Sequence, residues 1–205
     1  MLLKRPNFKR RIWSCRLPHG CCAVVTDADR ALETLHSLCA EMDSRHKLLQ
    51  EAEVGSLKEY NALHPDECLP YVVAVIDEFC DLIMKVGKEA ERLIVMIAQS
   101  AHAVGIHLVI ATQRPTANII TEAIKANFPA RAAFRVISSI DSAVILDRTG
   151  ANQLLGKGDM LFLQGNEPVR VQCAFVDIGE VRKITEYIDS NMPDDKSEDV
   201  AGRKE

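Results

Sequence analysis

The sequence predicts an α/β fold built on a parallel sheet, and three observations lead to this prediction. Apolar runs at 71–76, 106–111 and 132–137 have the length and composition of strands buried on both faces. Segments with helical spacing lie between these runs, which is typical of strand–helix–strand units. Polar side chains directly follow the first two runs, at the end of the sheet where α/β proteins place their ligands.

The first part of the chain predicts two helices before the sheet begins. Thr26 or Asp27 is a suitable helix cap, and leucines recur after it at helical spacing as far as Leu49. A short helix around Ser56–Leu63 follows, and a proline-containing connection leads from it to the first strand. Residues 1–22 match no periodic pattern and form a separate basic arm.

The remaining elements follow the strands in order. Helices are expected at Lys88–Val104, Asn118–Ala126, Asp141–Asp147 and Gly179–Asp189, and an antiparallel hairpin at Asp159–Leu163 and Val169–Phe175. Residues 191–205 are polar and acidic without apolar anchors, so we expect a disordered tail. The folded domain is therefore expected at 23–190.

The composition describes one ordinary globular domain with tails. Of 205 residues, 47% are hydrophobic, 26% charged and 5% aromatic, and the net charge of −4 gives no overall sign of nucleic-acid binding. Residues 1–16 hold six basic residues and no acidic one. This arm either touches phosphates or, as we favour, is an unstructured start.

Cysteine usage and hydropathy exclude several classes of protein. The seven cysteines include no C-x-x-C pair, so we expect reduced thiols rather than a metal site. No apolar run reaches the length of a membrane span. The basic start is not followed by the apolar stretch of a secretory signal. The sequence predicts a cytoplasmic protein.

Two carboxylates follow the strand at 71–76. Asp77 is placed to hold the shell of a magnesium ion through water, and Glu78 to orient or deprotonate an attacking water, as in nucleotide hydrolases. The alternative is a solvated acidic turn after an ordinary strand. Taken alone, the segment supports both interpretations equally.

The next strand adds a third polar side chain. It ends in Thr112-Gln113-Arg114-Pro115, and an amide at the tip of a neighbouring strand can sense both a γ-phosphate and the lytic water. The alternative for Gln113 is a turn residue before Pro115. Together the two strands favour a nucleotide hydrolase over a metal-dependent hydrolase of another type built on Asp77, Glu78 and Asp81.

Longer segments resemble a known family. LPYVVAVIDEFCDLIMKVGKEAERLIVMIAQSAHAVGIHLVIATQRP, IKANFPARAAFRV, IDSAVILDRTGA and LLGKGDML are similar to the FtsK/SpoIIIE-type DNA translocases. The resemblance runs from about Ala23 to Ile188. It implies a RecA-like P-loop NTPase core with an incomplete parallel sheet, helices on both faces and a C-terminal β-hairpin and helix.

The resemblance also implies a function of the chromosome-partitioning and cell-division type. Family members form a homo-hexameric ring around double-stranded DNA and use ATP and Mg to move along it. Asp77 and Glu78 would be the Walker B pair, with Mg held by Asp77 through water, and Gln113 the sensor. Arg114 would lie on a loop that faces the DNA.

The phosphate-binding loop of the family is not in this sequence. Neither Gly87-Lys88 nor Gly156-Lys157 is followed by Ser or Thr, so no G-x-x-x-x-G-K-[ST] motif occurs. We expect this loop to precede residue 1, which would make the chain the truncated, Walker B part of a motor. ATP binding by this chain alone is left open, and we expect no hydrolysis.

Two structural expectations follow from the missing loop. Its strand would lie beside the strand at 106–111, so we expect an unpaired apolar edge there and poor solubility. The family's winged-helix domain and its N-terminal membrane-tethering region are likewise not found in these residues.

Three positions depart from the family where it usually has cations. His102 stands in place of an arginine thought to reach a neighbour's ATP site, so this finger position is degraded. Ser139 and Ala143 stand in place of a lysine and an arginine on the second DNA-facing loop. Lys125 and Arg131 remain, either facing solvent or forming ion pairs.

Two hypotheses stay open. The chain is either part of an ATP-driven translocase motor, inactive alone because the Walker A loop is missing, or a non-catalytic FtsK-like paralogue or relic that acts as an interaction module. The missing loop favours the first, and the three lost cations favour the second.

Overall fold

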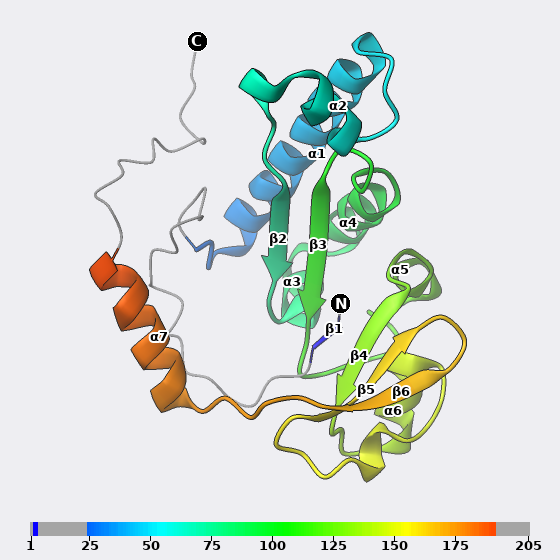
Figure 1. The fold of residues 1–205 in the computed structure, drawn as a ribbon. Coiled ribbons are helices and arrows are strands. Elements are labelled where there is room, and N and C mark those ends of the chain that lie inside the picture. The colour runs from blue at the N-terminus through cyan, green and yellow to red at the C-terminus, as the bar shows by residue number, and fades with distance from the viewer. Residues whose placement is uncertain (1, 4–23, 192–205) are drawn as a thin grey trace.

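Two small sheets organise the chain (Figure 1). The computed structural model describes residues 2–3 and 24–191. One sheet is parallel in the order β1-β3-β2, and the other is antiparallel in the order β4-β5-β6. The strands are β1 Leu2–Leu3, β2 Val72–Ile76, β3 Ile106–Ala111, β4 Ala130–Phe134, β5 Asp159–Gln164 and β6 Pro168–Gln172.

Seven α-helices and two short 3₁₀ helices lie within these described residues. They are α1 Ala28–Glu51, α2 Leu57–Leu63, α3 Phe79–Val86, α4 Lys88–Ser100, α5 Glu122–Asn127, α6 Ser139–Leu146 and α7 Ile178–Asn191, with 3₁₀ turns at Pro65–Glu67 and Ala151–Gln153. None of the helices in 24–191 is both long and apolar enough to cross a membrane. Apart from Leu2–Leu3 and Asn191, the expected basic arm and acidic tail fall outside the described residues.

Helix α1 begins where the sequence predicts. The Asp27 carboxylate accepts hydrogen bonds from the backbone N–H groups of Asp29 and Arg30, which would otherwise have no partner in the first turn. Leu35, Met42 and their apolar neighbours on this helix pack against Leu93, Ile94 and Ile97 of α4 in one core. These two helices cover one face of the parallel sheet (Figure 1).

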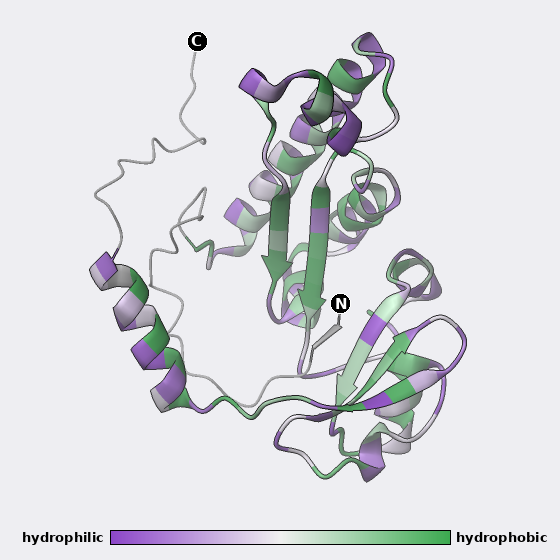
Figure 2. Cartoon of the chain, in the orientation of Figure 1, coloured by the Kyte–Doolittle hydropathy of each residue, from purple (hydrophilic) through white to green (hydrophobic). Residues whose placement is uncertain are grey.

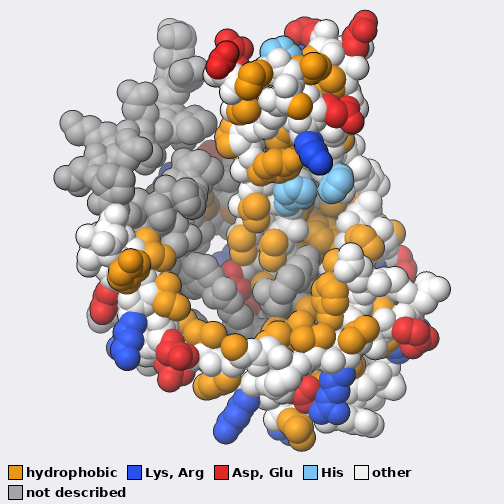
Figure 3. Space-filling view, in the orientation of Figure 1, with side chains coloured by type: hydrophobic (Ala, Val, Ile, Leu, Met, Phe, Trp, Pro, Cys, Tyr) orange, Lys and Arg blue, Asp and Glu red, His pale blue; other side chains and the backbone are white. Residues whose placement is uncertain are grey.

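The opposite face of the sheet at β2 is open. Val73 and Val75 are 60% and 57% exposed, whereas Val72 and Ile76 pack against the core. Figure 2 shows β2 as an apolar strand, and Figure 3 shows hydrophobic side chains on the face toward the viewer. The expectation that this strand is buried on both faces is therefore wrong. Among the described residues, the helix cover is on one face.

A buried arginine joins α1 to the starts of both long strands. Arg45 is 3% exposed, and its Nη1 donates to the carbonyl oxygens of Pro70 at 2.8 Å and Val104 at 3.2 Å. Its Nε donates to Glu41 at 2.6 Å, which provides a counter-charge. Pro70 and Val104 lie two residues before β2 and β3, so the guanidinium connects the amino ends of the two strands.

Strands β2 and β3 pair in parallel, as the sequence predicts. Val72 lies opposite Ile106, and the same register continues to Ile76 opposite Ile110. On the other edge of β3, Leu2 and Leu3 lie opposite Ile110 and Ala111. The expected unpaired edge is thus partly occupied, and β1 covers two of the six residues of β3.

The third predicted parallel strand belongs to the other sheet. The apolar run expected at 132–137 forms β4, Ala130–Phe134, which pairs antiparallel with β5. The apolar pattern found the strand, but strand direction depends on pairing partners distant in sequence. The predicted β5–β6 hairpin is confirmed, with Asp159 opposite Gln172.

Several helices differ in their limits from the prediction, and α3 was not predicted. Helix α4 ends at Ser100 rather than Val104, because the chain turns through Gly105 at φ 75° to enter β3. Helix α5 begins at Glu122, after the Thr121 side chain caps it. Helix α6 begins at Ser139, because Ser138 and Asp141 form a reciprocal capping box.

Candidate functional site

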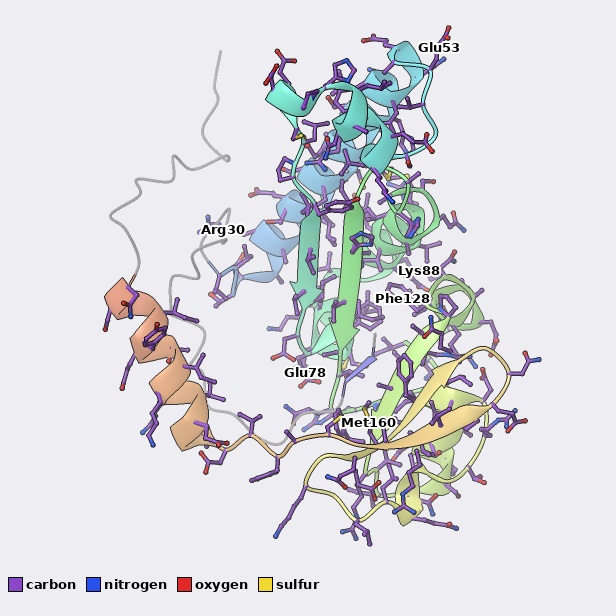
Figure 4. All side chains as sticks on the ribbon, in the orientation of Figure 1. Arg30, Glu53, Glu78, Lys88, Phe128 and Met160 are labelled. Atoms are coloured by element: carbon purple, nitrogen blue, oxygen red, sulfur yellow. The ribbon has the colours of Figure 1, made fainter. Side chains whose placement is uncertain are left out.

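The carboxyl ends of β2 and β3 bring together the residues expected to carry chemistry (Figure 4). Asp77 and Glu78 follow β2 directly, and Thr112 and Gln113 follow β3. Because the strands are parallel, both sets of side chains lie at the same end of the sheet, beyond the carboxyl ends of the strands. Figure 4 shows Glu78 at this end of β2, where the chain turns into α3.

Glu78 makes the turn from strand to helix in an unusual backbone conformation. Its φ of 53° and ψ of 51° are left-handed, a region that costs an L-residue roughly 1–2 kcal/mol. The next residue, Phe79, is fully buried at the start of α3. The turn therefore places Phe79 in the core while it holds the Glu78 side chain at the strand end.

The Glu78 carboxylate is bonded to the neighbouring strand. Thr112 Oγ1 donates to Glu78 Oε1 at 3.1 Å, and the Gln113 backbone N–H donates to the same oxygen at 3.0 Å. Thr112 is 2% exposed, so its hydroxyl has a fixed environment. Gln113, which the sequence predicts to be a sensor, thus lies beside Glu78, although the bond it makes is through its backbone.

Asp77 has a different environment from Glu78. It is exposed, whereas Glu78 is half-buried. An exposed carboxylate at this edge fits the expected role of holding a hydrated magnesium ion, because Mg²⁺ keeps several of its waters. Within the described residues, no group of three or more His, Cys, Asp or Glu side chains could hold a metal directly.

Cys80 fixes the loop after β3 from the other side. Its Sγ donates to the Arg114 carbonyl oxygen at 2.9 Å, and the residue is 3% exposed. Burial raises the pKa of the Cys80 thiol, so it stays protonated and able to donate. The Arg114 backbone is therefore held, while its side chain is exposed.

The two basic residues left open by the sequence both form ion pairs. Lys125 Nζ lies 2.6 Å from Asp147 Oδ1, and Arg131 Nη1 lies 2.7 Å from Asp147 Oδ2. Hydrogen bonds to Asp147 and Glu122 raise the pKa of Lys125. Partial burial of Asp147 opposes its ionisation, but the two cations outweigh this and lower its pKa.

His102 lies at the other end of the parallel sheet. It precedes β3, whereas Glu78 follows β2, so the two side chains are separated by the length of the strands. His102 is exposed and its ring meets His107 edge-on, with centroids 5.6 Å apart. The position cannot serve the Glu78 site of its own chain.

Ser139 and Ala143 are on a helix rather than on a loop. The capping box extends α6 to Ser139, so the loop expected at these positions is wrong, and Ala143 lies within the helix that the sequence pattern predicts. Ser139 is exposed, and Ala143 lines an open hollow of about 420 Å³ between α5 and α6, together with Lys125. Arg114 lies outside this hollow.

The sequence around these strand ends matches one protein family. Residues 15–117, half of the chain, match the FtsK/SpoIIIE family. The chain belongs to the FtsK/SpoIIIE family. The matched residues include both carboxylates after β2 and the segment after β3.

Relatives with assigned names extend this match. The DNA translocase FtsK of Chlorobaculum tepidum is 48% identical over 172 residues, covering 83% of this chain and 21% of that protein. The DNA translocase SftA of Bacillus subtilis is 44% identical over 184 residues, covering 87% and 19%. The chain therefore spans about one fifth of the length of these FtsK/SpoIIIE relatives.

Solved structures confirm the expected RecA-like P-loop ATPase fold. The pCW3 conjugation coupling protein TcpA, in its monomer form with ATPγS, has a TM-score of 0.71 at 33% identity over 80% of this chain and 50% of TcpA. EssC (ATPases 2 and 3) of Geobacillus thermodenitrificans has a TM-score of 0.75 at 21% identity over 93% of this chain and 36% of that chain. At that identity the second likeness shows the fold alone.

Sequence reasoning missed Thr112, Cys80 and Asp147 as organising residues. Thr112 is the direct partner of Glu78, and the only signal for it was its place before Gln113. Asp147 joins two cations from two other elements, α5 and β4, and a pattern of charges along the chain does not reveal such pairing.

Proposed function

We propose that this chain supplies the catalytic-carboxylate and sensor part of an ATP-driven motor that moves double-stranded DNA. One observation carries the proposal. In a chain of the FtsK/SpoIIIE family, Glu78 at the end of β2 is bonded to the first two residues after β3, one of which is Gln113. The ends of β2 and β3 thus place a candidate base beside a candidate sensor, the two groups that hydrolysis of a terminal phosphate needs.

Each residue has a distinct part in the proposed chemistry. Asp77 accepts hydrogen bonds from the water shell of magnesium, and Glu78 orients and deprotonates the attacking water. The Gln113 side chain binds the terminal phosphate oxygen and the same water. ATP with magnesium, when bound, supplies the phosphoryl group. These residues fit its magnesium side, but the 205 residues hold no phosphate-binding loop.

The proposal also includes DNA binding, assembly into a ring and a cellular location. Arg114 is exposed after β3 and meets a phosphate of the duplex, while Lys125 and Arg131 are engaged by Asp147. A homo-hexameric ring around the duplex, a part in chromosome partitioning and a cytoplasmic location follow from this proposed substrate.

The residues present in this chain are proposed to be insufficient for turnover. Backbone N–H groups and a lysine must surround the β- and γ-phosphates, and no G-x-x-x-x-G-K-[ST] segment is present to provide them. We therefore expect no DNA-stimulated ATP hydrolysis by this polypeptide alone.

A split-motor experiment tests the proposed function. The 205-residue chain is mixed with the part of the Chlorobaculum tepidum relative that precedes the matched region, where the family resemblance places the phosphate-binding loop. We expect DNA-stimulated hydrolysis to appear only in the mixture and to be abolished by Glu78→Gln. Asp81→Asn, a neighbouring exposed carboxylate outside the proposed site, is the matched control.

The second candidate function is a non-catalytic module that joins or caps a ring. His102, Ser139 and Ala143 favour it, because the family resemblance puts cations at these positions and His102 and Ser139 are exposed here. This candidate predicts that the two parts associate without hydrolysis. That outcome would overturn the motor proposal and retain the module.

A further inference from the structure

Glu78 has a backbone conformation that its own residue type does not favour. Four non-glycine residues in the described part of the chain have positive φ, and Glu78 is the one that lies at the proposed catalytic edge. Non-glycine residues keep this left-handed backbone conformation when the surrounding structure holds them in it, and such residues are concentrated at functional sites. The surrounding contacts therefore show what holds Glu78 in place.

A closed set of contacts holds the Glu78 carboxylate. Thr112 Oγ1 and the Gln113 N–H both donate to Glu78 Oε1, at 3.1 and 3.0 Å. The Thr112 hydroxyl oxygen also accepts from the Arg114 N–H at 3.2 Å. On the other side of the turn, Cys80 Sγ donates to the Arg114 carbonyl oxygen. We call these four contacts among Glu78, Cys80 and Thr112–Arg114 the Glu78 clasp.

The clasp restricts what Glu78 can do. An oxygen of a carboxylate has two lone-pair directions, and two donors from the strand β3 end occupy Oε1. The second oxygen, Oε2, is the one left to meet a water while the two donors hold Oε1. The arrangement is therefore a resting position for a general base.

The clasp also connects Glu78 to Arg114 through the backbone. The Arg114 N–H binds the Thr112 hydroxyl, and the Arg114 carbonyl binds Cys80, whereas the Arg114 side chain is exposed. A force on that side chain acts on the same backbone groups that close the clasp. The Arg114 side chain and the Glu78 carboxylate are therefore coupled directly through the backbone of Arg114 and the side chain of Thr112.

We propose that Thr112 is a positioning residue that stores Glu78 in this resting position, and that binding of a duplex phosphate by Arg114 opens the clasp. This rests on the proposed function, because it takes DNA as the ligand of Arg114. Opening frees Oε1 to accept the proton of a water. ATP hydrolysis would then depend on DNA, because Glu78 acts as a base only after the duplex opens the clasp.

Amide hydrogen exchange at Gln113, measured by nuclear magnetic resonance on the whole chain, tests the clasp without any need for turnover. We expect the wild-type amide to exchange slowly and Glu78→Ala to speed its exchange by about tenfold or more, since a hydrogen bond to a charged group is lost. Thr112→Val should give part of this increase and Thr112→Ser almost none. Asp81→Ala is the charge-matched control, and the Ile110 amide in the β2–β3 ladder reports any general loss of stability.

The second arm adds a short DNA duplex under conditions where fluorescence anisotropy shows saturation. In the saturated wild-type complex the Gln113 amide should exchange about tenfold faster than in the free chain, consistent with loss of one charge-assisted hydrogen bond. Equal exchange in the free and saturated chain would overturn the opening step while the DNA function stands. Equal exchange in wild type and Glu78→Ala, with the Ile110 amide unchanged, would overturn the clasp. If the duplex does not bind, the proposed DNA function fails, and the free-chain arm by itself decides the clasp.

Discussion

Arg170 of β6 donates two hydrogen bonds to Asp159 of β5 across the C-terminal hairpin. Arg170 Nε lies 2.9 Å from Asp159 Oδ1, and Arg170 Nη2 lies 2.8 Å from Oδ2. The Asp159 side chain is 4% exposed, whereas that of Arg170 is 57% exposed. The Leu155 N–H adds a third donor at 2.7 Å. The pair joins the hairpin to the loop before it.

The first prediction concerns stability at acid pH. Hydrogen bonds from Arg170 and then from the Leu155 backbone lower the pKa of Asp159 to about 2. An unfolded Asp has a pKa of about 3.9, so the folded state gains stability above that pH and loses it as the pH falls towards 2. Melting temperatures across this window should fall less steeply for Arg170→Met than for wild type. Parallel curves would contradict the assignment.

Gly158 and Gly165 provide a matched pair for backbone strain in the same hairpin. Both have positive φ, at 96° and 109°, but a Cβ on Gly158 would lie 2.3 Å from the Cys173 carbonyl oxygen, whereas one on Gly165 meets nothing within 4 Å. Gly165→Ala should cost roughly 1–2 kcal/mol of unfolding free energy from the left-handed conformation alone. Gly158→Ala should cost at least ~2 kcal/mol more, because backbone must move. Urea denaturation measures both, and equal costs would contradict the close contact.

Substitutions at Glu53 and Glu78 distinguish the cost of backbone strain from the stabilisation by the clasp. Their φ values are 54° and 53°, but Glu53 is exposed and outside any clasp. Glu53→Gly should stabilise the protein by about 0.5–1 kcal/mol, since glycine adopts positive φ readily. Glu78→Gly should give no such gain, because lost hydrogen bonds to a charged group offset it by ~1.5–3 kcal/mol. An equal gain at both positions would mean that the clasp contributes nothing to stability.

Arg114 and Lys125 should differ in their effect on duplex binding. Arg114→Ala should reduce the slope of log affinity against log salt by about 1, as loss of one phosphate contact predicts. Lys125→Ala removes the same charge, but Lys125 is bonded to Asp147 and 12% exposed, so the slope should not change. Anisotropy titrations at several salt concentrations measure both slopes. An effect of Lys125→Ala as large as that of Arg114→Ala would show that the ion pair opens on binding.

His102→Arg tests whether the cation that the family resemblance places at this position limits turnover in the split-motor mixture. The side chain is exposed, so the substitution should change unfolding free energy by less than ~0.5 kcal/mol. In the split-motor mixture it should raise turnover, because an arginine finger is worth ~10³–10⁵ in this class. Unchanged turnover with unchanged stability would remove the case for a degraded finger at this position.

The sequence predicted the parts of the fold that local patterns determine. Both parallel strands, the hairpin and the cap of α1 at Asp27 are where the patterns indicated. The direction of β4 could not be predicted, because it depends on pairing with β5, about thirty residues further along the chain. The open face at Val73 and Val75 was also missed, because these exposed residues are apolar and complete a continuous run that is typical of a strand buried on both faces.

The sequence predicted which residues of the candidate site lie close together, but not the hydrogen bonds and ion pairs that they form. Asp77, Glu78 and Gln113 follow two strands that the pattern placed side by side, so their proximity was foreseeable. The left-handed turn at Glu78 was not, because a glutamate carries no sign of positive φ. The pairing of Lys125 and Arg131 with Asp147 joins α5, β4 and the end of α6, and only the folded chain brings these together.

Arg45 is distant from the catalytic edge, yet it bears on which residues meet there. It fixes Pro70 and Val104 at the amino ends of β2 and β3, an offset of 34 residues that the strand register also has. The same offset, continued along both strands, brings Glu78 level with Thr112. A slip of two residues, the smallest that keeps each side chain on its own face, would set Ile76 or Cys80 there instead. Contacts at the amino ends of β2 and β3 thus help to decide which residues face each other at the carboxyl ends, where Glu78 meets Thr112.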